Sequence, residues 1–80
     1  MSAAEAQEVK AVLLQSDDNY RQLANRHHEL DTRLHELAEK HYLSASEQVE
    51  EVTIKKRKLA LKDQMEAIAR QHHPNGRASN

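Results

Sequence analysis

The sequence contains no cysteine, phenylalanine or tryptophan, and its 80 residues include only one proline and one glycine. Without cysteine the chain has no disulfide and no thiolate ligand for a metal, which is typical of proteins in a reducing compartment. Hydrophobic residues make up 38% and aromatic residues 2% of the chain, too little for a thick globular core. A single core of this size rarely supplies more than about 3–5 kcal/mol, and such chains commonly add a staple or a partner subunit.

Long apolar runs and an excess of positive charge are also missing. No stretch approaches the ~20 apolar residues that span a bilayer, and the acidic N-terminus, with Glu5 and Glu8, does not resemble a signal peptide. We therefore expect a cytoplasmic protein with no membrane partner. The net charge of -1 provides no overall positive field that would attract nucleic acid.

One stretch does carry a clear pattern, a heptad-like apolar repeat that organises the rest of the chain. Its residues follow one another at alternating steps of three and four: Tyr20, Leu23, His27, Leu30, Leu34, Leu37 and His41. This spacing predicts a helix with one narrow apolar stripe on a charged surface. Such a helix is stable only when another helix covers the stripe.

A short helix is predicted before this stretch, over residues 4–15, with Val9 and Leu13 in phase with the later repeat. Four short polar residues follow at positions 16–19, and their side chains favour helix caps over helix interiors. We therefore expect a break there, with Ser16 or Asp17 capping the next helix. One unbroken helix is the alternative, since the apolar phase continues across the four residues.

The remaining sequence predicts an antiparallel partner for the second helix, which we expect over residues 17–41. Ser44 and Glu47 form a capping box that begins a third helix over residues 45–72. A connection of about three residues forces the two helices to be antiparallel. The predicted fold is all-α: a coiled-coil-like helical hairpin preceded by a short N-terminal helix, in a single domain spanning residues 1–80.

The only proline and glycine of the chain lie in the sequence Pro74-Asn75-Gly76. Neither residue favours the interior of a helix, so these positions should end the third helix. A disordered polar tail is expected over residues 74–80.

The pairing of the two long helices can be predicted, because facing residues in an antiparallel pair have numbers that add to a constant. A sum near 88 places mostly apolar residues of the third helix opposite the apolar repeat of the second. The predicted seam residues on the third helix are Ile54, Lys58, Leu61, Met65 and Ile68. The pairing fails towards the tip, where Leu37 would face Glu51.

A second apolar stripe, formed by Val49, Val52 and Leu59, falls on a different face of the third helix. Its cover must be the first helix or another copy of the chain. The first helix has too few apolar residues to cover that face along its whole length. We therefore predict a homo-oligomer, with a dimer favoured and these three residues at its interface.

Two runs of the sequence resemble the YdcH-like family of small bacterial proteins, which has no assigned function. The runs are YRQLANRHHELDTRLHEL, residues 20–37, and KKRKLALKDQMEAI, residues 55–68. The recurring features in them are Leu23, His27, Leu30, Asp31, Lys58, Leu59, Leu61, Lys62 and Asp63. The resemblance implies a helical hairpin that associates, and it implies no reaction.

Three charged residues of these runs lie beside the predicted seam: Asp31, Lys58 and Asp63. Partly buried polar groups of this kind fix the pairing of helices in coiled coils, and we favour that interpretation here. The alternative is an acid–base site formed with His27, but a helical hairpin offers little of the concave pocket that an enzyme needs. We predict that the protein is not an enzyme.

Six histidines raise the hypothesis of a metal site. His28, Asp31 and His35 are spaced along one helix face and could supply nitrogen and oxygen ligands to zinc. Helical ligand pairs usually lie four residues apart, however, and no two histidines have that spacing. A solvated polar face is the favoured interpretation, and we predict no metal and no cofactor.

A basic run, Lys55, Lys56, Arg57 and Lys58, followed by Lys62, is the only dense block of charge. Consecutive helical residues point about 100° apart, so the run does not form one flat patch. No aromatic residues alternate with it to stack on bases. The favoured function is a noncatalytic module that associates with itself or with another protein. The alternative is a nucleic-acid-associated accessory protein that binds weakly and nonspecifically through the Lys55–Lys62 face.

Overall fold

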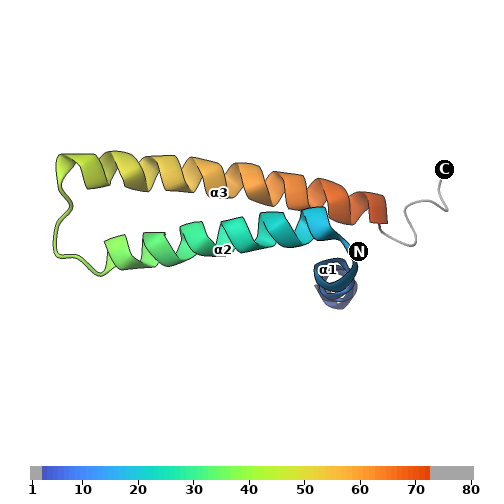
Figure 1. Cartoon of the computed structure of the whole chain (residues 1–80). Helices are drawn as coiled ribbons and strands as arrows, with labels where there is room; N and C mark the ends of the chain where they lie inside the picture. Colours follow the sequence, from blue (N-terminus) through green and yellow to red (C-terminus); the bar gives the residue numbers. More distant parts are fainter. Residues whose placement is uncertain (1–2, 73–80) are drawn as a thin grey trace.

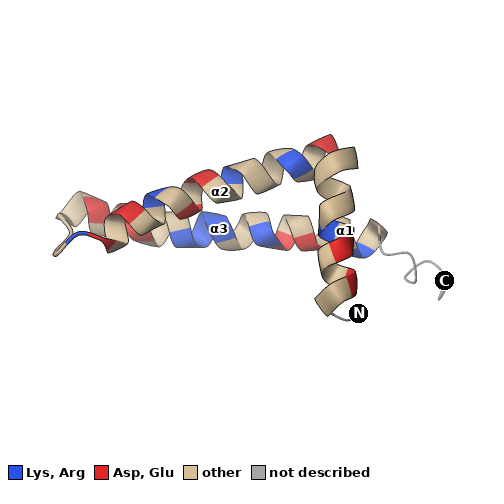
Figure 2. Cartoon of the chain, turned by 90° about the horizontal axis from the view of Figure 1, so that it is seen from below, with Lys and Arg blue, Asp and Glu red and all other residues tan. Residues whose placement is uncertain are grey.

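A computed structural model describes residues 3–72 and contains three helices: α1 (Ala3–Ser16), α2 (Asp18–Ala38) and α3 (Ala45–His72). The long helices α2 and α3 lie side by side and run antiparallel, and α1 crosses the open end of their hairpin (Figures 1 and 2). No strand occurs between residues 3 and 72. The predicted all-α hairpin with a preceding short helix is confirmed.

The break between α1 and α2 falls at Asp17, one of the two predicted caps. Its backbone is extended, with φ -118° and ψ 109°, and its Oδ1 accepts a hydrogen bond of 2.8 Å from the Tyr20 backbone N–H. Ser16 instead donates its hydroxyl back to the Val12 carbonyl, 2.7 Å away in the preceding turn. The alternative of one unbroken helix is therefore wrong.

A small apolar core closes the open end of the hairpin. Leu13 is 1% and Tyr20 2% exposed, and both cluster with Val9. Met65 and Ile68 of α3 pack against this cluster. Val9 and Leu13 are four residues apart and therefore lie on the same face of α1. The first helix thus covers the open end of the hairpin, and it does not cover the second apolar stripe of α3.

The tip of the hairpin differs in length from the sequence prediction. α2 ends at Ala38 and not at His41, in a tighter closing turn where the backbone N–H groups of Glu39 and Lys40 donate to the carbonyls three residues earlier, those of Glu36 and Leu37. His41 is exposed, so no buried side chain extends the helix that far. The connection consequently spans residues 39–44, about twice the predicted length.

The third helix begins with the predicted capping box. The backbone N–H of Ser44 donates to Glu47 Oε1 at 2.9 Å, and the backbone N–H of Glu47 donates to Ser44 Oγ at 3.2 Å. These two bonds satisfy backbone donors that the first turn of a helix leaves without partners. The predicted stop at Pro74–Gly76 and the predicted tail lie outside the described residues.

No helix within residues 3–72 is both long and apolar enough to pass through a bilayer.

Candidate functional site

The predicted seam residues lie along the contact between α2 and α3, with different degrees of burial. Four of them are buried: Tyr20, Leu37, Ile54 and Leu61. Seven are half-buried: Leu23, His27, Leu30, Leu34, Lys58, Met65 and Ile68. Leu37 is 1% exposed although the sequence pairing placed it opposite a glutamate. The seam therefore continues to the end of α2.

Asp31 and Lys58 meet across the seam, where the Lys58 ammonium donates a hydrogen bond to Asp31 Oδ1. This hydrogen bond and the positive charge of Lys58 lower the pKa of Asp31 below its usual value. Asp63, the third predicted polar residue, is exposed and forms no ion pair within residues 3–72. It does not fix the pairing of the helices, and the structure does not join it to His27 in an acid–base site.

A second ion pair across the hairpin was missed by the sequence analysis. The Arg33 guanidinium donates two hydrogen bonds to the Glu50 carboxylate, with Nε to Oε2 at 2.7 Å and Nη2 to Oε1 at 3.0 Å. This geometry holds the carboxylate at both oxygens and lowers the pKa of Glu50. In the predicted pairing, Glu50 lies more than one helical turn along α3 from the position that faces Arg33. No spacing in the sequence therefore indicated their contact.

The third cross-helix pair lies at the tip, where Lys40 in the connection donates to Glu47 in the first turn of α3. The pKa of Glu47 falls to about 2, first because of Lys40 and then because of the Ser44 backbone N–H. Asp31–Lys58 and Lys40–Glu47 each lie within one residue of the pairing predicted from the seam. Three ion pairs thus tie α3 to α2 and to the connection.

Of the three residues considered as zinc ligands, only His35 and Asp31 lie close together. His35 Nδ1 lies 3.0 Å from the Asp31 carbonyl oxygen and 3.7 Å from Asp31 Oδ2. His28 is exposed and does not join them. In the part of the chain that the structure describes, no three histidine, aspartate or glutamate side chains are grouped so that they could hold a metal ion.

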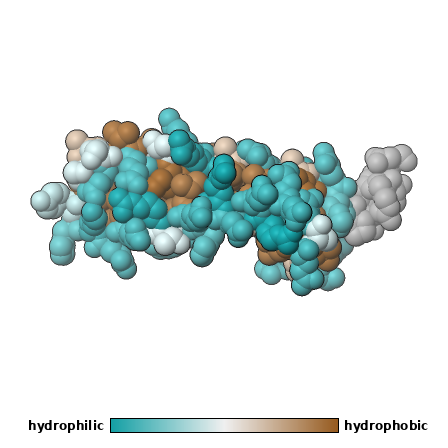
Figure 3. All heavy atoms as spheres, in the orientation of Figure 1, coloured by the Kyte–Doolittle hydropathy of each residue, from teal (hydrophilic) through white to brown (hydrophobic). Residues whose placement is uncertain are grey.

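The second apolar stripe is exposed, and we call it the outer stripe: Val49, Val52 and Leu59. These side chains are 67%, 52% and 61% exposed. Val49 and Val52 lie on the side of α3 opposite Ile54 and Leu61, which face α2 and are buried. Leu59 lies at the edge of that side, next to a cleft where α1 meets the hairpin. Hydrophobic side chains also reach the otherwise hydrophilic surface in several places on the face shown in Figure 3.

The basic run lies in the middle of α3 (Figure 2), and the structure divides its side chains among different surroundings. Lys55 Nζ lies 3.9 Å from Oε2 of Glu51, one turn earlier on the same helix. Lys58 is held by Asp31 across the seam, whereas Lys56 and Arg57 are exposed. The run therefore does not form one continuous basic face, as its helical positions predicted.

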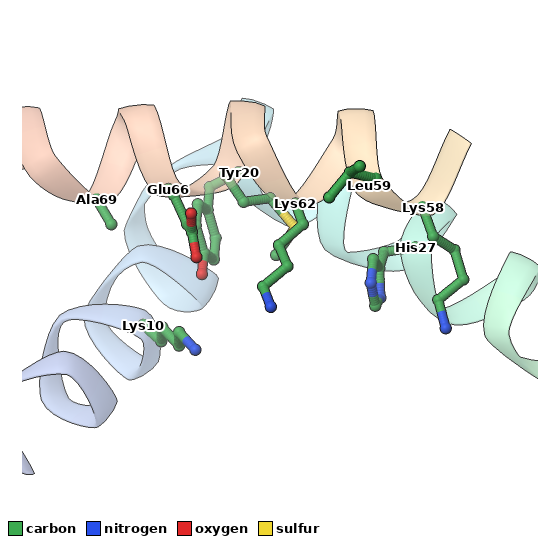
Figure 4. A pocket seen from close by; sticks show the side chains of 9 residues that line it. Lys10, Tyr20, His27, Lys58, Leu59, Lys62, Glu66 and Ala69 are labelled. Atoms are coloured by element: carbon green, nitrogen blue, oxygen red, sulfur yellow. The ribbon is translucent and has the colours of Figure 1, made fainter. Parts of the chain in front are cut away.

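A cleft of about 480 Å³ opens where α1 meets the hairpin, and we call it the open-end cleft (Figure 4). Its apolar lining consists of Tyr20, Leu59, Met65 and Ala69. Its charged and titratable lining consists of Lys10, His27, Lys58, Lys62 and Glu66. All three helices contribute, and burial raises the pKa of Tyr20 above its usual value.

The open-end cleft was not predicted, although several of its residues were singled out from the sequence. Tyr20, His27, Lys58 and Met65 were assigned to the seam, and Leu59 to the outer stripe. Lys10 completes the cleft from α1, and the angle at which α1 crosses the hairpin is not encoded in any local spacing. No sequence signal could therefore have identified this cleft.

Comparisons with known proteins identify the family and no function. A family model described as "Protein of unknown function (DUF465)" matches residues 21–69, which is more than half of the chain and excludes α1. No curated protein and no solved structure matches. The resemblance to YdcH-like proteins and the cytoplasmic location stay predictions. The chain therefore belongs to the DUF465 family of proteins of unknown function.

Proposed function

We propose that this protein is a noncatalytic interaction module that self-associates through the outer stripe of α3, with a homodimer as the functional unit. The observation that carries the proposal is the exposure of Val49, Val52 and Leu59, each more than half accessible to solvent. They lie on one side of a helix whose other side is already used for the hairpin. An apolar side of this kind is stabilised when a partner covers it.

The size of the core supports the same proposal. Within residues 3–72 only six apolar side chains are buried: Val9, Leu13, Tyr20, Leu37, Ile54 and Leu61. So small a core leaves the isolated chain with little stability. Apolar area buried between two chains adds about 25 cal/mol per Å² before the cost of association is deducted. A second copy therefore supplies stabilisation that the single chain lacks.

The geometry of α3 suits a two-fold symmetric contact. The helix has 28 residues and is therefore about 42 Å long. In an antiparallel pair of α3 helices, a two-fold axis beside the middle of the outer stripe brings Val49 of each chain to Leu59 of the other. The same three residues then serve both chains, and no other partner is needed to cover them.

Sedimentation equilibrium at micromolar concentration tests the proposal. We expect twice the 9.2 kDa chain mass and a melting temperature that rises with protein concentration. The double variant Val52→Lys with Leu59→Lys should sediment as one chain and melt at lower temperature. The matched control is Gln22→Lys with Thr32→Lys, which adds the same charge at two exposed polar positions of α2. The control should remain a dimer.

Two results would overturn the proposal. The first is a wild-type chain that sediments at 9.2 kDa while melting cooperatively, since the outer stripe then needs no cover. The second is equal dissociation of the outer-stripe variant and the α2 control, since added charge alone would then explain the effect. A salt-dependent complex between the monomeric chain and mixed-sequence nucleic acid would instead favour the accessory role.

A further inference from the structure

We propose that the open-end cleft binds a small anionic amphiphile, a molecule with a carboxylate or phosphate head and an aliphatic tail. The proposal does not rest on self-association, because the cleft is formed by the three helices of one chain, and Leu59 at its edge is the one residue that it shares with the outer stripe. Its volume of about 480 Å³ lies within the ~300–1,000 Å³ of ordinary small-molecule sites.

The charge of the cleft selects an anion. Lys10, Lys58 and Lys62 line it together with one carboxylate, Glu66. Asp31 neutralises Lys58, which leaves Lys10 and Lys62 against Glu66 and a net positive charge, although the whole chain is slightly negative. Neither of these two ammonium groups has an ion-pair partner among residues 3–72. An anionic head would supply the missing acceptor oxygens.

The arrangement of the two lysines places the head between α1 and α3. Figure 4 shows Lys10 extending from α1 and Lys62 from α3 into the same open space, with His27 of α2 on the far side of Lys62. Two cations held on separate helices can contact one head group from two sides. An ammonium group binds carboxylate and phosphate oxygens as a compact point charge, so either head group fits.

The remaining lining selects the tail. Leu59, Met65 and Ala69 provide an aliphatic wall, and Met65 is an unbranched side chain that adapts to irregular ligands. Tyr20 lines the cleft but is 2% exposed, so it has no free face on which a base could stack, and the only other ring is the small imidazole of the half-buried His27. The lining therefore favours an aliphatic tail over the base of a nucleotide.

The chain offers a specific probe of the cleft, because it contains only two methionines, Met1 and Met65. Protein labelled with ¹³C-methyl methionine gives one resonance for each, and Met65→Leu assigns them. Decanoate and decyl phosphate, below the concentrations at which they aggregate, should shift the Met65 resonance saturably. Decanol and acetate should bind much more weakly, since each lacks one part of the ligand, and decyltrimethylammonium should not bind.

Substitutions separate the cleft from the general basicity of the helix. The double variant Lys10→Met with Lys62→Met should weaken decanoate binding by about tenfold or more. The matched control is Lys56→Met, which removes a lysine from α3 that is exposed and does not line the cleft. The control should bind decanoate like the wild type, and both proteins should keep their helical circular dichroism.

Three results would overturn the proposal: no saturable shift of Met65 with either anionic probe, equal affinity for decanoate and decyltrimethylammonium, or an equal loss of binding in the Lys56 control. Flotation with phosphatidylglycerol vesicles distinguishes the source of the ligand. Flotation that needs Lys10 and Lys62 identifies a membrane lipid. Decanoate binding without flotation identifies a free amphiphile.

Discussion

The open end of the hairpin and its tip are stabilised in different ways. At the open end, Leu13 and Tyr20 are almost completely buried, and α1 packs across the pair formed by α2 and α3. At the tip, the seam ends at the buried Leu37, no further helix covers the connection, and Lys40–Glu47 joins it to α3 through side chains that remain partly exposed. Ion pairs in contact with water contribute little to stability, whereas buried apolar side chains contribute several kcal/mol each.

This difference indicates that α1 is part of the folded unit and not an appendage to the hairpin. The family match excludes α1, yet this helix supplies Val9 and Leu13 to the core. It also supplies Lys10 to the open-end cleft. The end of a hairpin that is far from its turn is the end most prone to separate, and α1 covers that end.

The largest expected effect tests the open end directly. Leu13→Ala should lower the free energy of unfolding by about 2–5 kcal/mol, because it removes a fully buried side chain from a small core. Leu14→Ala is the matched control. Leu14 is the next residue of α1 and is 42% exposed, so this substitution should lower the free energy of unfolding by about 0.5 kcal/mol or less. Urea denaturation followed by circular dichroism measures both values. Equal losses of unfolding free energy in the two variants would show that the face of α1 that carries Leu13 does not stabilise the fold.

A smaller effect is expected at the junction between α1 and the hairpin. Asp17→Ala should cost about 1 kcal/mol, because it removes the side chain that accepts from the Tyr20 backbone N–H at the start of α2. Asn19→Ala, two residues further along, removes an exposed polar side chain and should be nearly neutral. Denaturation curves that coincide for Asp17→Ala and the wild type would mean that Asp17 does not stabilise the break.

Local sequence patterns predicted the parts of the fold that depend on local physics. The repeat from Tyr20 to Leu37, the polar break at residues 16–19 and the capping box at Ser44 each involve residues a few positions apart. Their spacing determines which side chains share a helix face and which backbone donors are satisfied. The antiparallel hairpin follows from these features together with a short connection.

The features that the sequence did not predict depend on how the helices are placed in space. The crossing of α1, which creates the open-end cleft, has no local spacing behind it. The Arg33–Glu50 pair depends on long side chains that reach beyond their facing positions. The end of α2 at Ala38 depends on a closing turn, whereas the apolar repeat alone extended the helix to His41. Pattern analysis identifies helix faces, but it does not give the distances between helices.

The smallest expected effect concerns the tip and its dependence on pH. The pKa of Glu47 is about 2 in the folded chain and 4.5 for an isolated glutamate, so this residue stabilises the fold above about pH 4.5. That contribution is lost as the pH falls towards 2, and the lowered pKa values of Asp31 and Glu50 act in the same direction. The melting temperature should therefore fall over this range.

Glu47→Gln isolates the contribution of the tip to this acid effect. The variant lacks the negative charge that Lys40 contacts, so its melting temperature should be slightly lower than that of the wild type at pH 7. The difference between the two proteins should disappear as the pH approaches 2. Glu39→Gln is the matched control, because Glu39 is exposed and has no ion pair within the described chain. If Glu47→Gln and Glu39→Gln give the same pH profile, the Lys40–Glu47 pair does not stabilise the tip.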